Sequence, residues 1–182
     1  MSPVARTLAL LPALALMPAF ARHSLTVLME FENRPSQQSI AAMKTELESL
    51  LSEVDVNWRY LSDVKPDDQF PDLVVVRFKG ACELESIPPY LFDERGYYAF
   101  TYTSDGNVLP FSEVECDKVG KSVRAAMRRS DYPRQDQLMG RALGRVLAHE
   151  LHHVLAHSPE HGKTGVDRTA LSAKDLISDR IR

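Results

Sequence analysis

One pentapeptide near the end of the chain constrains its fold more than any other stretch: His149-Glu150-Leu151-His152-His153. It lies in a run whose apolar residues recur at helical spacing, so we expect it on a largely buried helix. Histidines four residues apart project from one helix face, about 6 Å apart along the axis. Two such imidazoles can bind one Zn²⁺, and Glu150 can reach a metal-bound water without being a ligand. The rest of the chain must therefore support this helix and supply a further ligand.

Length and charge exclude several classes of protein. The chain has 182 residues, which suits one domain with a real core. Apolar residues make up 44% and charged residues 26%, an ordinary balance for a globular protein. The formal net charge is −3, so no basic surface indicates nucleic acid as a partner. Oligomeric state and substrate are left open by the composition.

The first 21 residues have the features of a signal peptide. Arg6 precedes a short apolar run at residues 8–16, and Ala19-Phe20-Ala21 fits the small-x-small cleavage pattern. The alternative is an uncleaved membrane anchor, but the run is too short for a span and is interrupted by proline. We expect cleavage after Ala21 and a single domain over residues 22–182, secreted or periplasmic and not membrane-bound.

Strand and helix patterns alternate along the first two thirds of the chain. Strands are predicted at residues 25–31, 56–60 and 73–78, a helix at residues 36–54, and a hairpin formed by residues 97–103 and 108–115 around Ser104-Asp105-Gly106-Asn107. The continuous apolar run at residues 73–78 predicts a central parallel strand buried on both faces.

The last third is helical in pattern. Residues 118–129 are either a helix or a loop. The motif helix is predicted from about residue 134 to about residue 157, where Ser158-Pro159 ends it. A short helix is expected after Ser172, because Ser172 and Asp175 have the spacing of a capping box.

This order of elements, together with the H-E-x-x-H motif at residues 149–153, resembles the zincin metallopeptidases and, among them, the metzincin-like group. The resemblance covers most of the chain in element order, but in residues it rests on the segment from His149 to about Gly162. It implies an α/β (α+β) fold: a twisted, mostly parallel mixed sheet of about five strands with an antiparallel edge strand from a hairpin. The first helix and the buried motif helix would pack on that sheet.

The chain contains two cysteines, Cys82 and Cys116. An exported protein meets an oxidising compartment, so we expect a disulfide rather than two buried free thiols. The resemblance supports this pairing, because it implies that the third and fifth strands are parallel neighbours. Each cysteine follows the end of one of those strands, so both would lie at the same edge of the sheet.

The third metal ligand is where the sequence departs from the metzincin pattern H-E-x-x-H-x-x-G-x-x-H. Ala156 replaces the glycine, Pro159 replaces the third histidine, and no methionine follows the helix for a Met-containing turn. His161, beyond the helix break and beside Gly162, is the leading substitute. The alternatives are Glu160, His157 and a distant residue such as Asp167 or Asp175. His157 lies about 12 Å along the helix axis from His149, which is far for one tetrahedral ion.

If the resemblance holds, the chain is a secreted zinc-dependent hydrolase that cleaves peptide bonds in a peptide or protein substrate. Zn²⁺ would be bound by His149, His153 and His161, with Glu150 as the general base. Residues 97–103 would form an exposed sheet edge to which an extended substrate adds as a strand. A phenol could assist catalysis, with Tyr98, Tyr102 and Tyr132 as candidates.

Two other functions fit the same residues. One is a secreted zinc-binding interaction module without turnover, in which a structural ion would require four protein ligands. The other is sequestration of a different transition metal, since imidazole also suits copper and nickel. An intact Glu150 favours the hydrolase, because a structural site needs no general base.

Overall fold

The structure is a computed structural model that describes residues 23–84 and 97–181. The predicted signal peptide lies outside these residues. The elements are β1 His23–Asn33, α1 Gln37–Leu50, β2 Val54–Tyr60, β3 Leu73–Ala81, β4 Ala99–Ser104, β5 Asn107–Glu115, α2 Cys116–Ala126, α3 Gln135–Ala156 and α4 Ala173–Ile177. Short 3₁₀ turns occur at η1 Leu61–Asp63, η2 Arg129–Arg134 and η3 Gly165–Asp167.

The five strands form one sheet in the order β2-β1-β3-β5-β4. β1 is parallel to β2 and β3, and β3 is parallel to β5, whereas β4 is antiparallel to β5 and forms the edge. The hairpin turns at Asp105 and Gly106, both at positive φ, as a two-residue turn between twisted strands requires. The predicted fold class, a mostly parallel sheet with an antiparallel edge strand, is therefore confirmed.

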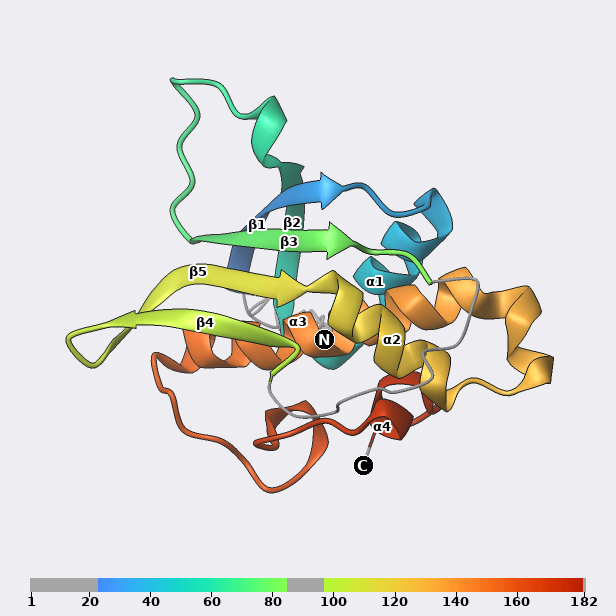
Figure 1. Cartoon of the computed structure of the whole chain (residues 1–182). Coiled ribbons are helices and arrows are strands. Elements are labelled where there is room, and N and C mark those ends of the chain that lie inside the picture. Colours follow the sequence, from blue (N-terminus) through green and yellow to red (C-terminus); the bar gives the residue numbers. More distant parts are fainter. Residues whose placement is uncertain (1–22, 85–96, 182) are drawn as a thin grey trace, which may run out of the picture.

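α1 and α3 pack on one face of the sheet, with which they form the core (Figure 1). Val74, Val76 and Phe78 of β3 point to this face and are fully buried. On the opposite face, Val75 is half-buried and Arg77 is exposed. The prediction that this strand is buried on both faces was wrong. β3 is central as expected, but α1 and α3 both cover the same face, so the other one carries ion pairs such as Arg77–Glu30.

α3 approaches α1 closely because glycines line the contact. A Cβ atom at Gly140 would lie 2.2 Å from the Ser39 carbonyl oxygen, and one at Gly144 would lie 2.7 Å from the Met43 carbonyl oxygen. α1 begins after Ser36, whose side chain accepts a hydrogen bond from the Ser39 amide and so caps the helix. This close contact places the motif helix directly beneath the sheet.

The predicted disulfide is present. Cys82 follows β3 and Cys116 begins α2, their Cα atoms are 4.6 Å apart, and both residues are fully buried. The parallel pairing of β3 with β5 brings the two cysteines together, as the resemblance implied. Residues 118–129, expected to be either a helix or a loop, contain most of helix α2, which begins at Cys116 and ends at Ala126.

A candidate metal centre

α3 carries the motif where the helix passes beneath the edge of the sheet. Glu150 and His153 are buried, at 4% and 7% exposure, and His149 is half-buried. The helix ends at His157, which has a positive φ of 49°, close to the predicted position. The chain then turns back along α3, because a residue in the left-handed conformation reverses its direction.

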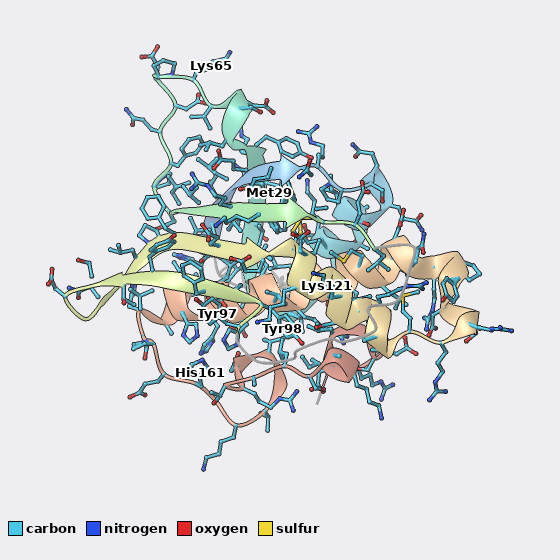
Figure 2. All side chains as sticks on the ribbon, viewed as in Figure 1. Met29, Lys65, Tyr97, Tyr98, Lys121 and His161 are labelled. Carbon is cyan, nitrogen blue, oxygen red and sulfur yellow. A yellow bond between two sulfur atoms is a disulfide. The ribbon has the colours of Figure 1, made fainter. Side chains whose placement is uncertain are left out.

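This reversal brings His161 to the two motif histidines. The ring centroid of His161 lies 5.1 Å from that of His149 and 4.7 Å from that of His153. The three residues offer ligand nitrogens that all lie within 4.8 Å of one another. They are the one group of three or more potential metal ligands found in residues 23–84 and 97–181. In Figure 2 the labelled His161, Tyr97 and Tyr98 all lie below β4.

Backbone carbonyls orient the two helical histidines. Nδ1 of His149 lies 2.6 Å from the Val166 oxygen, and Nδ1 of His153 lies 2.9 Å from the Ser158 oxygen. Because a carbonyl only accepts, each Nδ1 must be the donor, and each neutral ring then has a bare lone pair on Nε2. The two Nε2 atoms face each other at 3.3 Å.

Two lone pairs at this distance repel unless a cation or a proton lies between them. Two nitrogens that bind one tetrahedral zinc at 2.0–2.1 Å are about 3.3–3.4 Å apart, which the His149–His153 pair matches. Hydrogen bonds from the second ring nitrogen to carbonyl groups are typical of metal-binding histidines. The residues present therefore fit a metal ion, with His161, whose side chain is exposed, as the third ligand.

Glu150 points from α3 towards β4. Its Oε2 accepts a hydrogen bond of 2.7 Å from the Thr101 hydroxyl, which is also 2.9 Å from the Ser112 hydroxyl. Burial raises the pKa of the Glu150 carboxyl above its ordinary value, while the Thr101 hydrogen bond and His153 oppose the shift. Burial is also the largest cause that lowers the pKa of His149, which favours the neutral, metal-binding form of its ring.

An open cleft exposes these groups along β4. One part, of about 330 Å³, is lined by Thr101 and Val108 on one side and by the three histidines and Glu150 on the other. A smaller part, of about 120 Å³, continues past His149 and Glu150 to Val146 and Leu171. The cleft therefore gives a molecule in solution access to both the histidine cluster and the carboxylate.

The structure places the other ligand candidates elsewhere. Glu160 and His157 are exposed and lie outside the histidine group. Asp167 lies 3.5 Å from the exposed ring of His152. Asp175 caps α4 through Ser172, in the capping box that the sequence predicted, and pairs with Arg168.

Of the three phenol candidates, one lies at the cleft. Tyr98 lines its smaller part, where its hydroxyl accepts a hydrogen bond from Ser122. Tyr102 lies on the opposite face of the sheet, near Glu113, because alternate residues of β4 point to opposite faces. Tyr132 lies in η2 beneath the Arg124 guanidinium. Tyr102 and Tyr132 therefore lie away from the histidines and are excluded as the phenol that assists catalysis.

Sequence reasoning missed Thr101, Val166 and Ser158. Thr101 contacts Glu150 with its side chain, and a signal for it existed in the hairpin: alternation from Ala99 places Thr101 on the inner face. Val166 and Ser158 act through main-chain carbonyls, which carry no residue-type signal.

Comparisons with known proteins found no matching family model, curated protein or solved structure. Fold and site define a class: an α/β protein with a single, mostly parallel sheet and a three-histidine cluster that could bind a metal ion. No helix in the described ranges is long and apolar enough to cross a membrane. The resemblance to zincins stays a prediction.

Proposed function

We propose that this protein is an exported zinc-dependent hydrolase that cleaves peptide bonds. The observation that carries the proposal is the position of Glu150 beside the three-histidine cluster: the carboxylate is buried and reached through the same open cleft. A site with three protein nitrogens leaves one position of a tetrahedral ion for water or substrate, as catalytic zinc sites do. The disulfide fits an oxidising compartment outside the cytoplasm.

When bound, zinc would supply an acidified water and polarise the carbonyl group of the substrate. His149, His153 and His161 would hold it through their ring nitrogens. Glu150 would accept a proton from the attacking water and donate it to the leaving amine. Thr101, which donates to Oε2, would keep one carboxylate oxygen fixed while the other turns towards the reacting atoms.

The edge strand supports a peptide as substrate. Within residues 23–84 and 97–181, β4 pairs with β5 on one side and with no strand on the other. It lies along the cleft, which Thr101 of β4 lines and where Thr101 hydrogen-bonds to Glu150. An extended peptide could therefore pair with the free edge of β4 and bring a backbone carbonyl to the histidines.

The test measures cleavage of an unfolded protein substrate by purified, zinc-loaded protein. We expect cleavage that a zinc chelator abolishes and added Zn²⁺ restores. Glu150→Gln should lower turnover by a factor of about 10²–10⁴, the usual contribution of a general base, while zinc stays bound. The matched control is Glu160→Gln, because Glu160 is exposed and outside the histidine cluster; it should leave turnover unchanged.

The same samples separate a hydrolase from a zinc-binding interaction module. A structural zinc ion contributes to folding, so its removal would unfold such a module. A hydrolase with its own core should keep its circular dichroism spectrum after chelation and lose turnover alone. Cleavage that persists in Glu150→Gln would contradict the role given to Glu150, and stoichiometric zinc without any cleavage would favour the module.

A further inference from the structure

We propose that residues 162–179, here called the C-terminal segment, position His149 and His161 for metal binding, and that Arg168 is the positioning residue that holds this segment in shape. The inference rests on the metal site of the proposed function and extends it to residues outside the motif. Figure 1 shows the segment running beneath the sheet from the end of α3 to α4.

The segment contacts His149 through its η3 turn. The carbonyl oxygen of Val166, in the middle of this turn, is the one that lies 2.6 Å from Nδ1 of His149. The Val166 side chain packs against the hydrophobic core, which holds the carbonyl in place. The tautomer and ring orientation of His149 therefore depend on where η3 lies.

The same turn holds the backbone next to His161. The amide of Gly162 donates to the Asp167 carbonyl at 2.8 Å, and Gly162 forms a parallel bridge with Arg168. A Cβ atom on Gly162 would lie 2.9 Å from that of Asp167, so the two strands of chain touch. The contact between Gly162 and Asp167 closes a loop. His161 directly precedes this loop, and Val166 at its other end orients His149.

Arg168 joins this loop to α4. Its Nε donates to the Gly165 carbonyl at 3.2 Å, and its Nη2 lies 3.0 Å from the Asp175 carboxylate. Gly165 has a φ of +66°, which bends the backbone back towards the guanidinium. One side chain therefore links the η3 turn to the helix that follows it.

The far end of the segment is anchored on the motif helix. Arg145, one turn before His149 and 1% exposed, donates to the Asp175 carbonyl and pairs with Glu46 of α1 at 2.7 Å. Arg141 donates to the carbonyls of Ile177 and Ser178. The C-terminal segment is thereby tied to α3 at both ends, so its turn is held rather than free to move away from His149.

A positioning role predicts that loosening η3 weakens metal binding while the protein stays folded. Two glycines allow a matched comparison. Gly165 and Gly106 both have positive φ, and at neither would an added Cβ meet an atom within 4 Å. Alanine at either position would strain the backbone without a clash. Gly106 lies at the tip of the hairpin, outside the C-terminal segment, so it serves as the control.

The experiment measures Co²⁺ affinity of the full chain by competition with a chromogenic chelator, and records the visible spectrum of the Co²⁺ complex. Near-ultraviolet circular dichroism first establishes that each metal-free variant is folded. We expect Gly165→Ala to lower the affinity about 10- to 100-fold, the usual effect of disturbing a partner of a metal-binding histidine. Gly106→Ala should bind Co²⁺ within twofold of the unchanged protein.

Arg168 gives a second, independent variant. Arg168→Gln removes the charge that faces Asp175 and should lower Co²⁺ affinity by a similar factor and alter the spectrum. Arg168→Lys keeps that charge and should recover part of the loss. A purely structural role would instead lower the thermal midpoint of the metal-free protein with unchanged affinity and spectrum.

The outcomes separate this inference from the proposed function. If the unchanged protein binds Co²⁺ and folded Gly165→Ala and Arg168→Gln bind it equally well, the positioning role is wrong and the metal site stands. If Gly106→Ala weakens Co²⁺ binding as much as Gly165→Ala, backbone strain anywhere in the protein lowers the affinity, and the inference also fails. If the unchanged protein binds no Co²⁺ or Zn²⁺, the proposed function fails, and this inference with it.

Discussion

At the scale of single residues, the protonation pattern of the histidines is the feature that most favours a metal. Carbonyl groups at Val166 and Ser158 require a proton on Nδ1 of His149 and His153. The Nε2 atoms of both rings are left facing each other at 3.3 Å. A cation bound between them would remove that repulsion, so this arrangement of the two rings favours metal binding.

Removing the third histidine tests the cluster directly. His161→Ala should lower zinc affinity by a factor of at least about 100, because two imidazoles and water bind zinc much more weakly than three imidazoles. The control is Glu160→Ala, one residue earlier, exposed and outside the histidine cluster, which should change the affinity less than twofold. Competition with a chelator of known affinity measures both. Equal affinities of the two variants would remove His161 from the site.

At the scale of elements, the contact between α1 and α3 decides where the motif helix lies. Gly140→Ala should destabilise the protein, although alanine favours a helix by about 1 kcal/mol over glycine. The new Cβ would lie 2.2 Å from the Ser39 carbonyl oxygen and 2.7 Å from the Ala42 Cβ, so the helices must separate. We expect a net loss of about 1–3 kcal/mol in urea unfolding.

The exposed residue Gln137, on the same helix, provides the control for this substitution. Gln137→Ala meets no backbone and should leave the unfolding free energy within about 0.5 kcal/mol. If Gly140→Ala proved as stable as the unchanged protein, the close packing of α1 on α3 would be contradicted.

Asp131, in the η2 turn before α3, makes a pH-dependent contribution to the stability of the fold. A hydrogen bond from the Arg128 amide, and then one from the Arg134 side chain, lower the pKa of Asp131 below its ordinary value of 3.8. This stabilisation is fully present above the pKa of the unfolded chain and is lost as the pH falls through the lower, folded pKa. Asp131→Asn should therefore be less stable than the unchanged protein at pH 6.

The two proteins should converge in stability as the pH falls from 6 towards 3, because the carboxyl group of the unchanged protein becomes neutral like the amide. Urea unfolding midpoints at both pH values measure the difference. A gap that widened towards pH 3 would show that the carboxylate does not stabilise this turn.

At the scale of the whole molecule, the disulfide links the central strand to the first residue of α2, across 34 positions of sequence. In the chain-entropy account, closing a loop of this size stabilises the folded state by about 4 kcal/mol. We expect the double variant Cys82→Ser, Cys116→Ser to be less stable by about 2–4 kcal/mol in urea unfolding. Adding a reductant should destabilise the unchanged protein and leave the variant unaffected.

Much of the fold was predictable because its signals are local. Apolar periodicity marked α1 and α3, turn residues at Asp105 and Gly106 marked the hairpin, and Ser172 with Asp175 marked the start of α4. The double burial of β3 was predicted wrongly, since an apolar run such as Val74–Val75–Val76 does not reveal whether both faces of the sheet are covered.

The sequence by itself determined which residues can bind a metal on one face of a helix: the spacing of His149 and His153 has one geometric meaning once the segment is helical. Tertiary structure decided the rest of the site. The left-handed turn at His157 and the bridge at Gly162 bring His161 to the cluster, and the register of β4 brings Thr101 to Glu150. These partners come from other segments of the chain or are main-chain carbonyls. The type of a residue predicts neither which distant segment lies beside it nor the direction in which a carbonyl points.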